Sequence, residues 1–291
     1  MNIQVFVVNA FTKNKSGGNP AGVVVDGDGL SAAGMQYIAS EMGLSETAFI
    51  QYSSTADYRI RYFTPVSEVD LCGHATIAFF ALLVQRKSIN KNSFTIETKA
   101  GILTVRIDGE KVFLTQNNPQ FSKELDKTEI AQSLHIEEAD IMTTLPIEIV
   151  STGLKDILVP IKNNEVLQSL QPDFNRIKEI SAKHGVVGYH VFTLETDKGG
   201  ADAYCRNFAP LYDINEESAT GTASGALTGY LYKHNCVKPG ATSLLFEQGH
   251  VMNAPSEIIS HVKVDTNNKV DSLEVGGEGI YISSRWIELS S

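Results

Sequence analysis

Residues 72 to 84 read Cys-Gly-His-Ala-Thr-Ile-Ala-Phe-Phe-Ala-Leu-Leu-Val, and this stretch constrains the fold more than any other. After its first three residues, the only polar side chain is that of Thr76. A helix on a protein surface has one apolar stripe, and a membrane-spanning helix needs roughly 20 apolar residues. The stretch therefore predicts a helix that is buried on every side within a domain. Gly73 and His74 lie at its start, where unpaired backbone N–H groups and the helix dipole attract anions.

Residues 220 to 232 have a similar design and read Thr-Gly-Thr-Ala-Ser-Gly-Ala-Leu-Thr-Gly-Tyr-Leu-Tyr, without a charged residue. Gly221 and Thr222 align with Gly73 and His74 of the first stretch. Two buried helices of one design indicate two similar domains whose helix N-termini converge on a single anionic ligand. The alternative is two unrelated core helices.

The composition is that of a globular protein, with 42% hydrophobic and 20% charged residues in a chain of 291, a length that suits two domains. The formal charge of -10 and the lack of a Lys/Arg run argue against a nucleic-acid partner. The first residues do not resemble a signal peptide, and we expect no membrane span. Cys72, Cys205 and Cys236 are widely spaced, so we expect a cytoplasmic protein with free, structural thiols.

Many short strands, few long helices and no regular strand–helix alternation indicate an α+β fold with mostly antiparallel or mixed pairing. We expect Ser31 and Asp126 to cap helices, Gly43 to end the first of these, and residues 211–219 to form a loop. A further helix is expected near 173–184. The strands that we expect are 2–8, 21–25, 47–51, 57–63, 93–97, 101–107, 111–115, 147–151, 156–161, 187–194, 202–208, 242–247, 258–265, 269–275 and 279–288.

The sequence lacks the common cofactor and metal motifs. It has no G-x-G-x-x-G after a strand, no P-loop, no H-E-x-x-H and no G-x-S-x-G. The seven histidines are scattered, and no group of carboxylates has the spacing of metal ligands. We therefore expect no cofactor and no metal, and we expect the chemistry to come from ordinary side chains around the two helix starts.

Five segments carry a family resemblance, and they read GNPAGVV (18–24), SETAF (45–49), RYFTP (61–65), CGHAT (72–76) and ATGTA (219–223). In this order they resemble the PhzF family, the phenazine-biosynthesis-like isomerases, and the resemblance covers essentially the whole chain. Each segment alone is weak evidence, whereas five at matching spacing are highly specific. Phenazine synthesis itself is not implied, because nothing in the chain identifies a pathway.

The family is similar in fold to diaminopimelate epimerase. The resemblance thus implies two similar domains, each a mixed, barrel-like sheet wrapped around a central helix, with the site in the cleft between them. We expect an N-terminal domain over 1–117, with 278–291 as a candidate completion, and a C-terminal domain over 118–277. The family resemblance also implies a homodimer.

The family's proton shuttle falls on Glu46, and the resemblance places His74 in the same site, where it would hold or polarise the substrate. A carboxylate that faces a closed apolar cleft loses solvation, so its pKa rises. It can then take a proton from carbon and return it elsewhere near neutral pH. The alternatives are an exposed glutamate at a strand edge and a structural histidine.

The resemblance also implies how a substrate is held. The backbone N–H groups of Gly73, Gly221 and Thr222 are expected to bind a substrate carboxylate. Ser45 and Asn19 are further candidate substrate-binding residues, although a role in the turn explains Asn19 equally well.

The chain departs from the family at the second helix start. Where the family often has Asp-Pro-Ala-Thr-Gly-Ser, this chain reads Glu-Ser-Ala-Thr-Gly-Thr from Glu217 to Thr222, so the acid is one methylene longer and the proline is missing. We expect Glu217 to be a second acid/base or an orienting group, and the alternative is a solvated loop acid. Two-thiol epimerases and racemases carry a cysteine at each helix start, whereas this chain has Cys72 at the first and Thr220 at the second.

The sequence thus predicts a cofactor-independent isomerase that moves a proton within a small unsaturated or cyclic carboxylic acid, with Glu46, His74 and Glu217 as its catalytic residues. A non-catalytic protein that binds a small acid or a protein partner is the alternative from another class. An epimerase or racemase is the third option.

Overall fold

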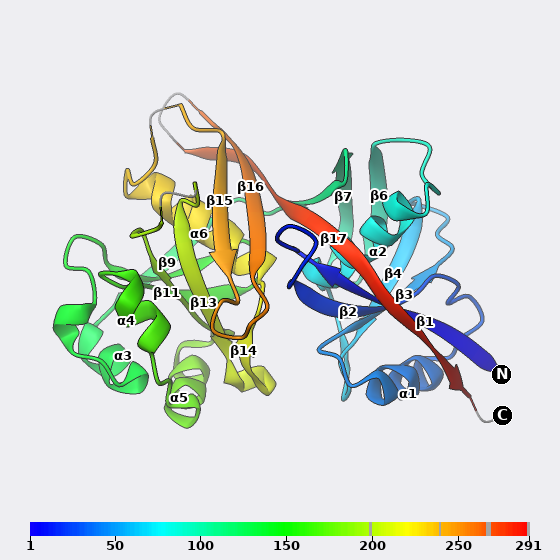
Figure 1. Ribbon diagram of the computed structural model, residues 1–291, viewed down its shortest axis with the longest axis horizontal. Helices are drawn as coiled ribbons and strands as arrows, with labels where there is room; N and C mark the ends of the chain where they lie inside the picture. The colour runs from blue at the N-terminus through cyan, green and yellow to red at the C-terminus, as the bar shows by residue number, and fades with distance from the viewer. Residues whose placement is uncertain (198–199, 239, 266–268, 290–291) are drawn as a thin grey trace. The chain divides into compact units, whose positions relative to one another are not determined.

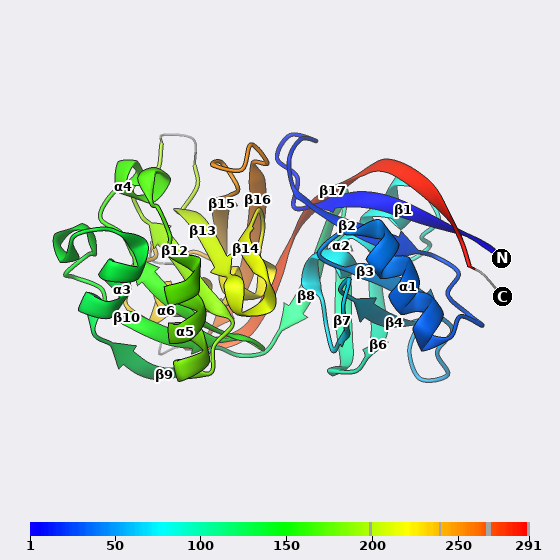
Figure 2. The same cartoon turned by 90° about the horizontal axis from the view of Figure 1, so that it is seen from below.

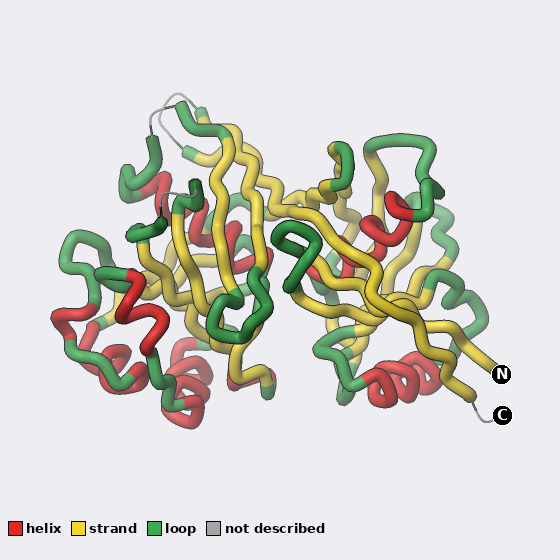
Figure 3. Tube along the Cα trace, in the orientation of Figure 1, coloured by secondary structure: helices red, strands yellow, loops and turns green. Residues whose placement is uncertain are grey.

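A computed structural model describes residues 1–197, 200–238, 240–265 and 269–289. The chain forms two compact units. Unit 1 comprises Met1–Thr115 with Gly276–Ser291, and unit 2 comprises Gln116–Val275. Strands predominate over helices in both units (Figure 3). Within the described ranges, no helix is long and apolar enough to cross a membrane.

The elements of unit 1 (Figure 1) are β1 (Asn2–Ala10), β2 (Asn19–Val24), α1 (Ala32–Met42), β3 (Thr47–Gln51), β4 (Tyr58–Phe63), β5 (Glu68–Val69), α2 (Gly73–Gln85), β6 (Ser93–Thr98), β7 (Gly101–Asp108), β8 (Lys111–Gln116) and the second part of β17 (Val270–Glu288). Eight of these strands close a barrel in the order β1, β2, β3, β4, β6, β7, β8 and β17, which pairs again with β1. The pairs β2–β3 and β4–β6 are parallel, whereas β1–β2, β3–β4, β6–β7, β7–β8 and β1–β17 are antiparallel. The predicted mixed barrel is therefore confirmed.

Strand β4 shows how the sequence places one helix inside the barrel of unit 1 and another outside. Tyr58 packs edge-on against two phenylalanines of α2, and Tyr62 bonds to Thr76 of the same helix. Phe63, which points the other way, belongs to an apolar cluster with Met35 and Ile38 of α1. Because side chains alternate along a strand, α2 lies on the inner face and α1 on the outer face. Figure 2 shows α1 along the outside of β3.

The elements of unit 2 are β9 (Gln120–Leu125), α3 (Lys127–Leu134), the 3₁₀ helix η1 (Glu138–Asp140), β10 (Ile147–Ser151), β11 (Lys155–Pro160), α4 (Asn164–Ser169), α5 (Phe174–His184), β12 (Gly188–Thr193), β13 (Ala203–Ala209), the 3₁₀ helix η2 (Pro210–Tyr212), β14 (Ile214–Glu217), α6 (Gly221–Lys233), β15 (Ser243–Gln248), β16 (Ser256–Val264) and the start of β17. The order of strand pairing is β9, β10, β11, β12, β13, β15 and β16, with β14 also paired to β13.

Helix α6 is the central helix of unit 2. It contacts β10, β11 and β16, and its residues from Ala223 to Tyr232 are all buried. Tyr230 packs edge-on against Phe192 of β12, and Thr228 bonds to Ser260 of β16. On the opposite face of the strands, an apolar cluster joins β10, β11, β12 and β13 to α3, α4 and α5. Each unit therefore wraps a sheet around one buried helix, as predicted.

Two details of the predicted elements were wrong. Residues 211–219 were expected to form a loop, but they include part of η2 and strand β14. The Asn-Glu-Glu sequence of β14 lacks an apolar alternation, and its pairing is with β13, the strand that precedes it. The strands expected at 269–275 and 279–288 are one strand, β17. Gly276 lies within this strand, and a Cβ there would overlap the carbonyl of Val112 in β8.

The two glycines Gly229 and Gly34 allow a matched test of the packing around α6. A Cβ at Gly229 would overlap the ring of Pro119, whereas one at Gly34 in α1 would meet Ser31 Oγ at an ordinary 3.5 Å. Alanine favours a helix by about 1 kcal/mol over glycine, but overpacking costs about 1–3 kcal/mol. We expect Gly34→Ala to keep or raise the thermal midpoint and Gly229→Ala to lower it. Equal midpoints in differential scanning calorimetry would show that α6 is loosely packed there.

Candidate active site

The two buried helices differ from the other α-helices at their N-termini. A side chain accepts a hydrogen bond from the first turn in α1, α3, α4 and α5, and the capping residues are Ser31, Asp126, Asn163 and Asp173. Neither Cys72 before α2 nor Thr220 before α6 makes such a bond. The first four N–H groups of a helix have no partner within the helix. Both buried helices therefore present donors and a positive dipole end that suit an anion.

Glu46 and His74 lie together at the start of α2 in unit 1. Glu46 directly precedes β3, where its carbonyl accepts a hydrogen bond from the backbone of Gly22 in β2 at 3.0 Å. Its Oε2 lies 3.4 Å from His74 Nε2, and the two side chains are 13% and 6% exposed. Ser45 Oγ lies 3.5 Å from the same nitrogen. The structure thus brings three predicted site residues together.

Burial raises the pKa of Glu46 above its ordinary value, although hydrogen bonds from Ser45 and Cys72 oppose the rise. The Oε2 atom is buried and has no hydrogen-bond partner among the described residues, because its contact with His74 Nε2 is close but not aligned as a hydrogen bond. A desolvated carboxylate with one unsatisfied oxygen is a stronger base than one in water. The group is therefore suited to take a proton near neutral pH.

Cys72 contributes to the same site, which the sequence did not predict. Its sulfur lies 3.3 Å from His74 Nδ1 and also bonds to Glu46, so this buried thiol orients both side chains. The signal was the spacing of one residue between Cys72 and His74 at a helix start. The ligand atoms of Glu46, Cys72 and His74 lie within 4.8 Å of one another. These are donor types that zinc accepts, so the same cluster is able to bind a metal ion.

The remaining predicted residues of unit 1 are Gly73 and Asn19. Gly73 is the first residue of α2, and the space where its Cβ would lie is open to 4 Å. This opening gives a ligand access to the helix start. Asn19 is buried at the start of β2 and pairs with Ala10 of β1. The role of Asn19 in binding stays a prediction.

In unit 2, Glu217 ends β14 and binds the residue that precedes α6. Thr220 Oγ1 donates a hydrogen bond of 2.6 Å to Glu217 Oε2. Gln248 Nε2 donates to the carbonyl of Glu217 at 2.7 Å and to Thr220 Oγ1 at 3.2 Å. Because the threonine hydroxyl is directed at the carboxylate, it does not cap α6. Glu217 is therefore part of an ordered network and not a solvated loop acid.

Gly221 and Thr222 form the first turn of α6. The carbonyl of Thr222 accepts a hydrogen bond of 3.0 Å from Thr152 Oγ1, which follows β10. Both residues of this first turn are only half buried, whereas the turns that follow are buried. The start of α6 is thus fixed to the sheet and keeps a partly open side.

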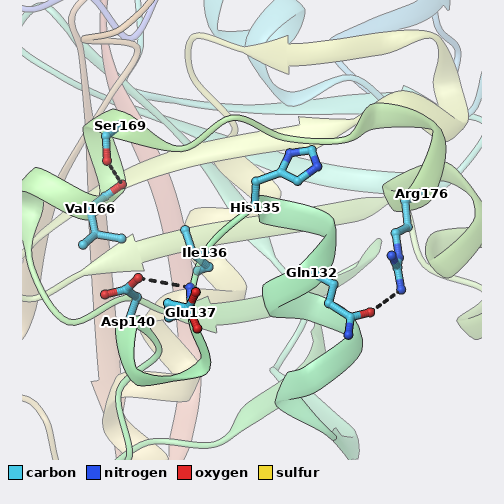
Figure 4. A pocket seen from close by; sticks show the side chains of 8 residues that line it. All are labelled: Gln132, His135, Ile136, Glu137, Asp140, Val166, Ser169 and Arg176. Atoms are coloured by element: carbon cyan, nitrogen blue, oxygen red, sulfur yellow. Dashed lines mark hydrogen bonds between the residues drawn. The ribbon is translucent and has the colours of Figure 1, made fainter.

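A surface pocket of unit 2 lies away from all of these residues (Figure 4). It is bordered by α3, η1, α4 and α5, and its lining includes His135, Asp140 and Arg176. The Arg176 guanidinium there donates a hydrogen bond to Gln132 Oε1. These elements lie on the outer face of the sheet, so this pocket does not reach the start of α6.

A buried pair of hydroxyls beneath the helix start of unit 1 gives a test of its rigidity. Tyr62 Oη and Thr76 Oγ1 lie 2.6 Å apart, and Thr76 also donates to the carbonyl of Cys72. Thr76→Val leaves the tyrosine hydroxyl buried without a partner, which costs about 1–3 kcal/mol. We expect the double variant with Tyr62→Phe to regain part of that loss in thermal midpoint. A double variant as unstable as the sum of both single changes would contradict this coupling.

Comparisons with known proteins identify the family of this chain. A family model described as phenazine biosynthesis-like protein (PhzC-PhzF) matches residues 8–285. An uncharacterized isomerase of Clostridium acetobutylicum is 34% identical over 289 residues, which cover 96% of this chain and 95% of the relative. The uncharacterized isomerase YddE of Escherichia coli is 39% identical over 259 residues, or 86% of each chain.

Solved structures show the same fold. The crystal structure of a Bacillus anthracis phenazine biosynthesis protein of the PhzF family has a TM-score of 0.92 and 33% identity, covering 99% of this chain and 100% of that one. A hydroxyproline epimerase from Agrobacterium vitis, with a TM-score of 0.64 and 14% identity over 98% and 92% of the two chains, shares the fold alone. The family match over nearly the whole length and the curated relatives named isomerases confirm the predicted class of enzyme, and the chain belongs to the phenazine biosynthesis-like PhzF family.

Proposed function

We propose that this protein is a cofactor-independent isomerase that moves a proton between two carbons of a small unsaturated or cyclic carboxylic acid. Glu46 is the general acid/base, and His74 and Glu217 are its catalytic partners. The predicted cytoplasmic location and homodimer stay predictions.

The environment of the Glu46 side chain is the observation that supports this proposal most strongly. Its carboxylate is buried, has a raised pKa and one oxygen without a hydrogen bond, and lies 3.4 Å from His74 at an uncapped helix start. A structural glutamate in a protein interior is normally paired with cations or fully hydrogen-bonded. Glu46 has instead the environment of a base that is available to a substrate.

The reaction follows from these groups. The Glu46 carboxylate takes a proton from a carbon of the substrate, and the electron pair of that C–H bond moves into the adjacent unsaturated system. Backbone N–H groups at the start of α2 favour the negative charge that develops there. The protonated Glu46 then returns its proton to a different carbon, which moves the double bond and regenerates the carboxylate. His74, within reach of Glu46 Oε2, orients the carboxyl group and the substrate.

In unit 2, we propose that the N–H groups of Gly221 and Thr222 bind the substrate carboxylate. Ser45 and Gly73 would contribute from unit 1, and Glu217 is the second group able to exchange a proton. The Thr220 hydroxyl holds Glu217 at 2.6 Å, which fixes the longer side chain that replaces the aspartate of the family.

The decisive experiment is deuterium exchange, followed by NMR, on a panel of small cyclic and unsaturated carboxylic acids in deuterated buffer. We expect the wild type to exchange carbon-bound hydrogen in at least one acid, and Glu46→Gln to lose at least about 100-fold in rate. The rate should fall on acidification through an apparent pKa above 4.5, because the raised pKa of Glu46 leaves less of the basic carboxylate.

Glu41→Gln is the matched control, because Glu41 lies in the same unit but is exposed on α1. It should exchange at the rate of the wild type. Exchange should also persist in EDTA, and added Zn²⁺ should inhibit if it occupies Glu46, Cys72 and His74. Thermal stabilisation by an acid without exchange would instead support the alternative of a non-catalytic binding protein.

A second prediction separates the isomerase from a two-thiol racemase. Cys72→Ser keeps a hydrogen-bond donor beside Glu46 and His74, so we expect its exchange rate to stay within about tenfold of the wild type. Cys72→Ala loses the donor and should be slower than Cys72→Ser. Abolition of exchange by both variants, together with a single-carbon inversion product, would favour an epimerase that uses Cys72 as its base.

A further inference from the structure

Unit 2 contains two buried acidic residues that differ in whether a cationic side chain pairs with them. Glu148 on β10 is 1% exposed and bonds to both Lys233 and His234 at the end of α6. Asp156 on β11 is 2% exposed, and no ion pair to it is recorded among the described residues. The Oδ1 atom of Asp156 also lacks a hydrogen-bond partner. Burial of an isolated carboxylate is energetically costly. The ion pairs of Glu148 explain how it can be buried, whereas the burial of Asp156 needs another explanation.

The side chain of Asp156 points to the inner face of the sheet. Its neighbours Ile157 and Val159 belong to the apolar cluster that packs against α3, α4 and α5 on the outer face. Because side chains alternate along a strand, Asp156 points to the side of α6. On β10, its paired residue is Val150, two positions before Thr152, which bonds to the first turn of α6. Asp156 therefore lies at the N-terminal end of this helix.

Glu217 points into the same space from β14. The preceding Glu216 forms an ion pair with Arg206, which also bonds to the carbonyl of Leu167 in α4 on the outer face. Glu217 points the opposite way and bonds to Thr220 at the start of α6. Burial raises the pKa of Asp156 to about 8, and the negative charge of Glu217 adds a smaller contribution in the same direction.

The other titratable groups on this inner face do not neutralise Asp156. His190 on β12 bonds to Asn207, and burial lowers its pKa to about 4, so it is uncharged at pH 7. Burial raises the pKa of Cys205 on β13, so its thiol keeps its proton. Glu148 and Tyr230 lie toward the other end of α6, where Lys233 and the carbonyl of Pro146 hold them. Among the described residues, Glu217 is the charged group that acts on Asp156.

We propose that Asp156 and Glu217 form a carboxyl pair with a single negative charge at neutral pH, in which Asp156 carries the proton and Glu217 is ionised. Two nearby carboxyls cannot both ionise cheaply, and the more buried one keeps its proton. Asp156 is thus a positioning residue that sets the charge around Glu217 at the start of α6. This assignment rests on the proposed function only for the role of Glu217 in catalysis.

The first test compares thermal midpoints of the wild type and Asp156→Asn between pH 5 and pH 8, without substrate. Unfolded aspartate ionises near pH 4, whereas folded Asp156 holds its proton to about pH 8, so this group makes the folded state less stable as pH rises across that window. Asparagine cannot ionise, so the variant does not lose stability in this way as the pH rises. We expect its midpoint to gain at least about 5 °C relative to the wild type from pH 5 to pH 8.

Glu148→Gln is the matched control, because it removes an equally buried acid that has cationic partners. It leaves Lys233 without its carboxylate and should lower the midpoint across the range. The gain from Asp156→Asn should shrink in a Glu217→Gln background, because the neutral amide no longer opposes ionisation of Asp156. A midpoint difference that does not change with pH, or a gain that is unaffected by Glu217→Gln, would overturn the proposal.

Infrared spectroscopy keeps the proposal testable if Asp156→Asn fails to fold. In wild-type protein with ¹³C-labelled aspartate, a protonated carboxyl band should persist at pH 7 and disappear above about pH 9, one unit past its midpoint. Absence of that band at pH 7 would overturn the assignment. Neither measurement needs turnover. If the expected pH dependence is found but no acid exchanges deuterium, the proposed function is rejected while the proposed carboxyl pair is still supported.

Discussion

The structure depends on burying two helices on every side while leaving the first turn of each without a side-chain cap. Burial of α2 and α6 follows from their apolar side chains and their lack of charge before the last turn, and the strands of each unit wrap around one of these helices. An uncapped first turn inside a protein is unfavourable unless something else meets its N–H groups. The four helices on the outer faces are capped. Among the described α-helices, α2 and α6 alone lack a side-chain cap, and these are the two helix starts at which we propose that a substrate carboxylate binds.

The residues before the two helices show why neither helix has a side-chain cap. Cys72 precedes α2, and its sulfur is directed at His74 and Glu46. Thr220 precedes α6, and its hydroxyl, a common helix cap, donates instead to Glu217. In each unit, the side chain that could cap the helix binds a carboxylate instead. This leaves the helix start open and positions an acid beside it.

Much of the fold was predictable because its signals are local. The apolar runs of α2 and α6, the alternation Tyr58, Ile60 and Tyr62, and the cap at Ser31 are each readable within a few residues. The motif of Glu46 and His74 also predicted which residues meet at α2. Cys72 and Asp156 were not predicted as members of a site, because their importance depends on side chains of other strands that face the same interior. Strand β14 was missed for a different reason, since its Ile-Asn-Glu-Glu sequence has no strand pattern and its pairing with the preceding β13 makes it a strand.

The charge at the start of α6 limits what this unit is able to bind. A helix N-terminus offers roughly half a positive charge, which two ionised carboxylates would outweigh, so that an anionic substrate would be repelled. With the proton on Asp156, one negative charge remains, and the Thr220 hydroxyl and the helix dipole offset it in part. A small acid is then compatible with the site. A protonated Asp156 on β11 would therefore make the proposed catalytic role of Glu217 compatible with the proposed acidic substrate.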